Sequence, residues 1–124
     1  MKGDDLKQRT KKFALSIIKL AEQLPHNRVG WTFTDQIIRS ATSVVANYRA
    51  ACRAKSDKDF ISKMETVIEE ADETLFWLEM IDESNIITDK TDLSPITKES
   101  NELLSIFVAS VKTVKSRLDA AKHS

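Results

Sequence analysis

The sequence of 124 residues predicts an all-α fold, an up-down-up-down antiparallel four-helix bundle that occupies residues 1–124 as a single domain. Apolar residues recur at three- and four-residue steps over four long stretches, which is typical of amphipathic helices. Only two glycines and two prolines are present, and no stretch alternates apolar with polar residues as a half-buried strand does. Short connections make neighbouring helices antiparallel, so four such stripes close into a bundle.

The first helix is expected from about Asp4 to Leu24, and Pro25 and Gly30 bracket the loop that follows. The second is expected to begin near Thr32, with Asp35 three residues later as in a capping box. The apolar stripes of these two helices are Leu6, Phe13, Ile17, Leu20, Ala21 and Leu24, and then Phe33, Ile37, Ala41, Val44, Val45, Tyr48 and Cys52.

The third helix is expected to start at Ser56, again with an acid, Asp59, three residues later. After a loop over about residues 85–93, Ser94 and Pro95 predict the N-cap and first residue of the fourth helix. The apolar stripes are Phe60, Met64, Val67, Ala71, Leu75 and Leu78 on the third helix, and Ile96, Leu103, Leu104, Phe107, Val111, Val114 and Leu118 on the fourth.

Composition argues against a membrane protein and a secreted protein. The apolar runs are far too short to span a membrane, and the N-terminus lacks the apolar core of a secretory signal. Cys52 is the only cysteine, which excludes an intramolecular disulfide and predicts a cytoplasmic protein. Its place on the apolar stripe predicts a buried, inert thiol.

The net charge is zero, but the charges are unevenly distributed. Residues 25–58 contain six Lys or Arg and two Asp or Glu, whereas residues 59–90 contain two and ten. This distribution indicates that the chain, or copies of it, are electrostatically self-complementary.

The sides of the second and third helices that point away from the core carry this charge. The outer side of the second helix is a line of arginines separated by small residues, namely Asp35, Arg39, Thr42, Ala46, Arg49, Ala50 and Arg53. The outer side of the third grades from acids into large apolar side chains, namely Thr66, Glu69, Glu73, Phe76, Trp77 and Met80.

Two interpretations of these surfaces stay open. The charged lines are simply solvated, with Phe76 and Trp77 covered by the loop over residues 85–93, or the two surfaces bind each other between copies. We favour self-association, because contiguous exposed aromatic and Met side chains mark interfaces. The two surfaces differ, so the contact is heterologous, and such contacts close into rings. The expected interface residues are Arg39, Ala46, Arg49, Arg53, Glu69, Glu73, Phe76, Trp77 and Met80.

No motif predicts catalysis, a cofactor, a metal or a small-molecule substrate. Di-metal bundles need Glu-x-x-His repeats, and neither His26 nor His123 stands three residues from a Glu. Asn47 is unusual inside a helix beside the core, and the tight turn between the second and third helices places it near Glu65, and Arg39 near Glu73. We therefore expect a polar clamp at a helix or subunit seam.

The segment Asp35-Gln36-Ile37-Ile38-Arg39-Ser40-Ala41-Thr42-Ser43-Val44-Val45-Ala46-Asn47 resembles the second helix of the four-helix-bundle family of 23S rRNA intervening sequences. That family has a Gln-x-x-Arg-Ser-Ala-x-Ser-x-x-x-Asn pattern there, and the third-helix segment Glu70-Ala71-Asp72-Glu73-Thr74 is also similar. The matching positions are Gln36, Arg39, Ser40, Ser43, Asn47 and Glu73. The family ending Asn-Ile-Ala-Glu-Gly is replaced here by Asn47-Tyr48-Arg49-Ala50-Ala51.

The resemblance implies a small bacterial protein without known catalysis, often a ring-shaped homopentamer. Related bundles are accessory variability subunits of retroelement reverse transcriptases, with basic surfaces that contact nucleic acid. Two functions follow for this chain: a homo-oligomeric scaffold or adaptor, or an accessory protein that binds an rRNA, a reverse transcriptase or another RNA or DNA partner. The second would use the arginines of the second helix with Lys2, Lys7, Arg9, Lys11 and Lys12.

Overall fold

The computed structural model describes residues 2–123 of the chain, and the side chains of residues 5–122. It consists of four helices, α1 (Lys2–Ala21), α2 (Arg28–Ala51), α3 (Asp57–Glu83) and α4 (Leu93–His123), and contains no strand within the described residues. The expected all-α fold with four helices is confirmed.

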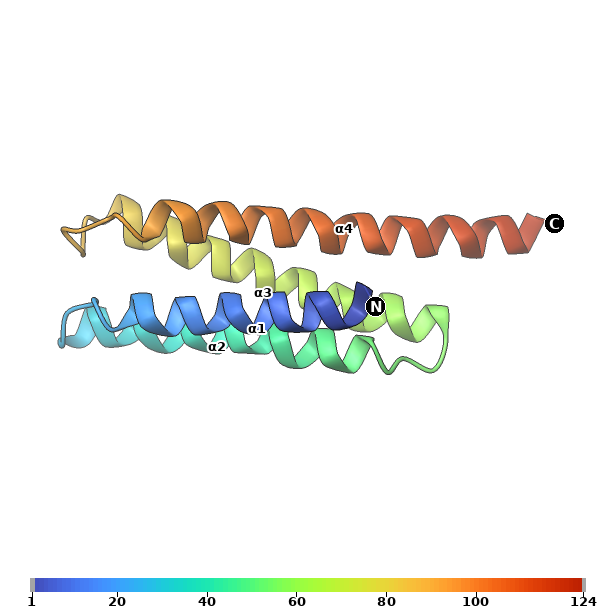
Figure 1. Ribbon diagram of the computed structural model, residues 1–124, viewed down its shortest axis with the longest axis horizontal. Coiled ribbons are helices and arrows are strands. Elements are labelled where there is room, and N and C mark those ends of the chain that lie inside the picture. The colour runs from blue at the N-terminus through green and yellow to red at the C-terminus, as the bar shows by residue number, and fades with distance from the viewer. Residues whose placement is uncertain (1, 124) are drawn as a thin grey trace.

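The helices form a closed arrangement in which each one packs against two others. Helix α1 contacts α2 and α4, and α3 contacts the same two helices from the other side. In Figure 1 successive helices run in opposite directions, and the loops over residues 22–27 and 84–92 lie at the same end of the molecule. This is compatible with the up-down-up-down order. Helix α4 extends beyond the N-terminus of α1 at the opposite end (Figure 1).

The core is built from the predicted stripes. Ile17, Ile37, Leu78 and Phe107, one from each helix, have no more than 1% of their surface exposed. Their burial supplies the driving force that short isolated helices lack. Polar residues also enter the core, since Thr10, Ser40, Thr74 and Ser100 are buried.

Helix α2 begins earlier than predicted, at Arg28 instead of Thr32. The side-chain oxygen of Asn27 accepts a hydrogen bond from the backbone N–H of Gly30 at 2.9 Å, so Asn27 is the N-cap. Gly30 lies in the first turn of this helix, and a glycine is required there because a Cβ would stand 1.8 Å from the carbonyl oxygen of Pro25. The loop folds tightly over this glycine, which places Trp31 on the helix.

The predicted start of α3 is confirmed, and the predicted start of α4 is wrong by two residues. Ser56 Oγ accepts from the Asp59 N–H at 3.1 Å, and the Asp59 carboxylate accepts from the Lys55 N–H at 3.0 Å, which is a reciprocal cap. Helix α4 begins at Leu93, so Ser94 and Pro95 stand in its first turn. Proline is tolerated there because the first-turn N–H groups have no helical acceptor.

Cys52 is exposed, so the expectation of a buried thiol is wrong. Helix α2 ends at Ala51, and Cys52 is its C-cap. The apolar stripe therefore stops one residue before the cysteine. Cys52 lines a surface depression of about 340 Å³ together with Phe60 and Arg117, at the end of the bundle occupied by the loop over residues 52–56.

Candidate interaction surfaces

The seam between α2 and α3 holds most of the motif residues. The Arg39 guanidinium donates to Glu70 at 3.2 Å and also pairs with Glu73, and these acids raise the pKa of Arg39, chiefly through the hydrogen bond to Glu73. Ser40 is buried, and its hydroxyl oxygen lies 2.9 Å from Thr74 Oγ1. The predicted proximity of Arg39 and Glu73 is confirmed, and the motif joins two helices of one chain.

The remaining motif residues act along α2 itself. The Asn47 side-chain amide donates to the carbonyl and to the hydroxyl of Ser43, both at 2.9 Å. Asn47 therefore does not pair with Glu65, whose carboxylate lies 3.9 Å from Lys115 Nζ. This hydrogen bonding satisfies the amide within one helical turn, which explains how an Asn is tolerated there. Gln36 is half-buried.

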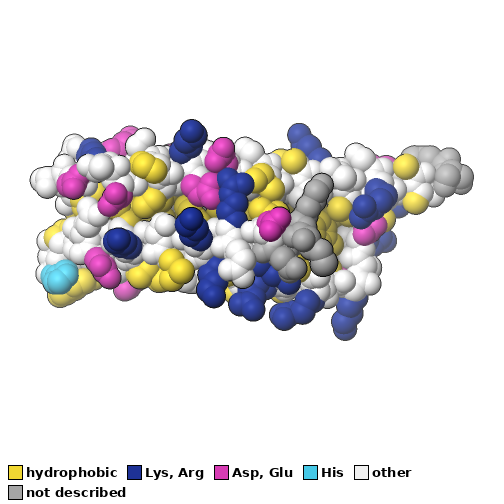
Figure 2. Space-filling model, in the orientation of Figure 1, with side chains coloured by type: hydrophobic (Ala, Val, Ile, Leu, Met, Phe, Trp, Pro, Cys, Tyr) yellow, Lys and Arg dark blue, Asp and Glu magenta, His cyan; other side chains and the backbone are white. Residues whose placement is uncertain are grey.

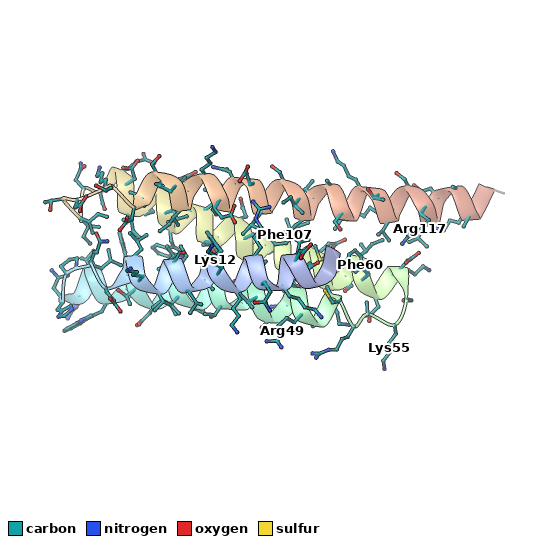
Figure 3. All side chains as sticks on the ribbon, viewed as in Figure 1. Lys12, Arg49, Lys55, Phe60, Phe107 and Arg117 are labelled. Carbon is teal, nitrogen blue, oxygen red and sulfur yellow. The ribbon has the colours of Figure 1, made fainter. Side chains whose placement is uncertain are left out.

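The arginines on the outer side of α2 differ in whether they have an acidic partner. Arg39, whose side chain is 48% exposed, is paired with acids of its own chain, and Ala46, Arg49 and Arg53 are also exposed. Within residues 5–122 neither Arg49 nor Arg53 forms an ion pair. Figure 3 shows Arg49 and Lys55 pointing away from the bundle. The C-terminal half of α2 therefore presents unpaired positive charge to solvent.

On α3, Phe76 and Met80 are 48% and 38% exposed, and Glu69 is also exposed. The loop over residues 84–92 thus leaves Phe76 uncovered. Trp77 is half-buried and packs between Phe33 at 5.5 Å and Phe76 at 5.0 Å, measured between ring centroids. Its Nε1 is buried and has no hydrogen-bond partner in the described part of the chain. Trp77 therefore belongs to the margin of the core, with Phe76 and Met80 outside it.

The basic residues of α1 do not form one surface. Arg9 bonds both carboxylate oxygens of Glu99 on α4, at 2.6 and 2.8 Å, and reaches Glu102 at 3.2 Å. These contacts lower the pKa of Glu99, and Lys12 adds to the effect through its charge. Figure 3 shows Lys12 on the α4 side of α1. Lys11 is exposed, Lys7 is half-buried, and the side chain of Lys2 lies outside the described residues.

A surface between α1 and α2 was not predicted from the sequence. Ile18, Trp31 and Ile38 line a depression of about 400 Å³ beside the loop over residues 22–27. Trp31 is 58% exposed and Ile18 36%. In Figure 2 hydrophobic side chains lie beside the histidine at this end, and Lys and Arg side chains gather along the lower edge toward the other end. An Asn three residues before Gly30 is a possible N-cap, and taking Asn27 as the N-cap would have predicted that Trp31 lies on the helix.

Within residues 5–122 no group of three or more His, Cys, Asp and Glu side chains is placed to hold a metal ion. No described helix combines the length and the apolar character that crossing a bilayer requires.

The order of the helices and the motif at the α2–α3 seam agree with a known family. The family model described as 23S rRNA-intervening sequence protein matches residues 4–109. The chain belongs to this family. The resemblance inferred from residues 35–47 is therefore confirmed, and the matched region ends within α4, before its projecting C-terminal part.

The family's fold is also seen in a solved structure. The chain is similar to a protein with unknown function from the S23 ribosomal protein family of Bacteroides thetaiotaomicron VPI-5482, whose crystal structure was determined at 1.70 Å resolution. The two share 32% sequence identity and superpose with a TM-score of 0.79, over 90% of this chain and 99% of the other. No curated protein matches the sequence.

Proposed function

We propose that this member of the family is a non-catalytic, homo-oligomeric scaffold or adaptor built on an up-down-up-down antiparallel bundle. The observation that carries the proposal is that large apolar side chains are exposed in two separate clusters, Phe76 with Met80 on α3, and Ile18 with Trp31 between α1 and α2. Clustered exposed aromatic and Met side chains are typical of interfaces, and two different clusters on one chain allow heterologous assembly.

The mass of the protein in solution tests the proposal. We expect the wild type to sediment as a multiple of its 14.0 kDa chain, and a pentameric ring, as the family resemblance implies, would have a mass of about 70 kDa. Phe76→Ser combined with Met80→Ser should shift the protein toward the monomer while leaving its helical content unchanged, because both side chains are exposed. Val108→Ser is the matched control, since Val108 is 37% exposed on α4. A monomeric wild type at micromolar concentration would refute the proposal.

A second function, binding of RNA or DNA as an accessory protein, has one observation in its favour. Arg49, Arg53 and Lys55 are exposed along the C-terminal end of α2 and the loop after it, where they form no ion pair within the described residues. Phosphate contacts of this kind give affinities that fall steeply with salt. Titration of labelled RNA and DNA between 50 and 200 mM salt tests the idea, with Arg49→Gln and Arg53→Gln as variants. Binding that is absent at 50 mM salt, or unaffected by the variants, would exclude this role for the arginines.

A further inference from the structure

Exposed positive charge gathers at the end of the bundle that holds the loop over residues 52–56. Residues 49–58 contain four Lys or Arg and one Asp, and residues 110–122 contain four and one, so each segment has a net charge of +3. All eight basic side chains are exposed, namely Arg49, Arg53, Lys55, Lys58, Lys112, Lys115, Arg117 and Lys122. In Figure 1 the C-terminal ends of α2 and α4 both lie toward this end of the molecule.

The two basic segments meet in one surface depression. The depression of about 340 Å³ is lined by Lys55 from the loop and by Arg117 from α4, and Phe60 and Val114 supply apolar lining. Figure 3 shows Lys55, Phe60 and Arg117 at this end, with Arg117 on the part of α4 that extends beyond α1. The charge of α4 therefore continues the charge of the loop across a shallow hollow.

The acids nearby leave most of this charge uncompensated. Asp57 pairs with Arg117 at 3.1 Å, and Asp119 is exposed. Glu65 reaches Lys115 only at 3.9 Å, and such a contact between exposed side chains contributes little. Within residues 5–122 six of the eight basic side chains form no ion pair, namely Arg49, Arg53, Lys55, Lys58, Lys112 and Lys122.

The basic end of α4 lies beyond the region that the family model matches. That region, residues 4–109, contains 14 Lys or Arg and 18 Asp or Glu, a net charge of −4. Residues 110–122 therefore add positive charge to a bundle that is otherwise acidic. We call residues 110–122 the α4 arm.

The lysines of the α4 arm share one side of the helix. Lys112, Lys115 and Lys122 are spaced by three and seven residues, which places them within about 80° of one another around the helix axis. They extend over about 15 Å along the axis at 1.5 Å per residue. Arg117 lies on another side, next to the depression. The arm therefore presents a line of ammonium groups that continues beyond the end of the bundle.

The uncharged exposed residues of this end indicate what kind of partner it fits. Large apolar side chains that are exposed occur in several parts of the described chain, but none lies in residues 49–58 or 110–122. The exposed uncharged residues of the α4 arm are small or hydroxylated, namely Thr113, Ser116, Ala120 and Ala121. Protein interfaces centre on aromatic and Met side chains and are poor in Lys. Contacts with phosphates use Lys, Arg, Ser and Thr and need no apolar centre.

We propose, resting on the second of the two proposed functions, that the α4 arm and residues 49–58 together bind the sugar-phosphate backbone of RNA or DNA. The basic side chains pair with phosphates, and the hydroxyl groups of Thr113 and Ser116 add hydrogen bonds. Binding through the backbone is independent of base sequence and weakens steeply as the salt concentration rises.

Two triple variants that remove the same charge test the role of the arm. The arm variant combines Lys112→Gln, Lys115→Gln and Lys122→Gln. The control variant combines Lys19→Gln, Arg28→Gln and Lys98→Gln, which lie toward the other end of the bundle. All six side chains are exposed, so both variants should fold, and circular dichroism and thermal melting establish this. Labelled RNA and DNA strands of two unrelated sequences are titrated between about 50 and 200 mM salt.

We expect the arm variant to lose affinity and salt dependence together. Each phosphate contact contributes about 0.7–0.9 to the slope of log affinity against log salt, so the slope should fall by about 2–3. At about 50 mM salt the affinity should fall on the order of 10-fold or more, whereas the control variant should stay within about twofold of the wild type. Both sequences should bind equally well. Sedimentation of the arm variant should match the wild type, because the arm is assigned to nucleic acid and not to self-association.

The outcomes separate this proposal from the function on which it rests. If the wild type binds neither RNA nor DNA at the lowest salt, both are overturned. If the wild type binds and Arg49→Gln weakens it, but the arm variant does not, the role of the arm is wrong and nucleic-acid binding stands. Equal losses in the arm and control variants would mean that net charge alone matters, which also overturns the proposal. Polyglutamate that competes as well as RNA of equal charge would assign this end to an acidic protein instead.

Discussion

The α2–α3 seam and the surface formed by Ile18, Trp31, Ile38 and Arg49 between α1 and α2, here called the groove surface, share helix α2. They differ in how their side chains are satisfied. In the seam, Arg39 is paired with two acids of α3, and Ser40 is buried beside Thr74. On the groove surface Trp31 is 58% exposed, and Arg49 has no ion-pair partner within the described residues. The seam therefore contributes to the stability and register of the bundle, whereas the groove surface is left exposed to solvent.

The largest expected effect comes from truncating a buried apolar residue of α2, Ile37, in contrast to an exposed one on the groove surface, Trp31. Ile37→Ala should lower the free energy of unfolding by about 2–5 kcal/mol, because Ile37 is fully buried and its truncation leaves a cavity. Trp31→Ala should change the free energy of unfolding of the isolated chain by no more than about 0.5 kcal/mol, because its side chain is exposed. Urea unfolding at low protein concentration, combined with sedimentation, measures both effects.

The two variants should therefore differ in opposite ways in unfolding and in sedimentation. Ile37→Ala should be the less stable chain, and Trp31→Ala the weaker assembler. If Trp31→Ala instead destabilises the isolated chain as much as Ile37→Ala does, Trp31 contributes to the fold and the groove surface is not free for a partner.

A second prediction concerns Gly30, which links the loop to the groove surface. Replacing Gly by Ala inside a helix normally stabilises it by about 1 kcal/mol. Here the added Cβ would meet the Pro25 carbonyl oxygen at 1.8 Å, so the backbone must move, and we expect Gly30→Ala to destabilise the fold by about 1–3 kcal/mol. Moving this turn also displaces Trp31, so assembly should weaken. Thermal melting measures the first effect and sedimentation the second.

The control for Gly30→Ala is a Gly/Ala exchange where no such contact exists. Ala46 is exposed in the middle of α2, and Ala46→Gly should cost about 1 kcal/mol from helix propensity alone. Alanine would then be preferred at position 46 and glycine at position 30. A stabilised Gly30→Ala variant would mean that the loop over residues 22–27 adapts easily and does not fix Trp31.

The start of a helix can be predicted from the sequence when the residues that fix it are close together in the chain. The start of α3 was predictable because its reciprocal cap involves only Lys55, Ser56 and Asp59. The start of α2 was not, because Gly30 reads as part of a loop until its contact with Pro25 is known. Periodicity assigns residues to the inner or outer side of a helix, but it leaves those on the boundary undecided.

The ion pairs between helices also differ in how far they can be predicted from local sequence. The tight turn between α2 and α3 fixes the level of Arg39 against Glu73, so that pair was predictable from residue numbers. Arg9 and Glu99 are 90 residues apart, and no local pattern sets the level at which α1 meets α4. The sequence therefore groups Arg9 with the possible nucleic-acid contacts, whereas in the structure Arg9 joins α1 to α4. Trp77 lay on the boundary and proved half-buried.

The smallest expected effect is the pH dependence of stability that comes from the ion pair between Arg9 and Glu99. Arg9 holds the pKa of Glu99 below its ordinary value of 4.5. A carboxyl whose pKa is lowered by folding stabilises the native state above its unfolded-state pKa, and this contribution is lost as the pH falls through the lowered value. Because Arg9 and Glu99 are both about one-third exposed, Glu99→Gln should cost only about 0.2–1 kcal/mol near pH 7. The difference from the wild type should therefore shrink as the pH falls below the ordinary glutamate pKa of 4.5.

Urea unfolding of the wild type and of Glu99→Gln between pH 3 and 7 measures this convergence. Glu102→Gln is the matched control, since Glu102 is more exposed and has one contact of 3.2 Å to Arg9, so its effect should be smaller. A difference that stays constant over the whole pH range would mean that the ion pair contributes nothing and that Glu99 acts by packing. If the difference converges, Arg9 stabilises the α1–α4 contact through its ion pair with Glu99.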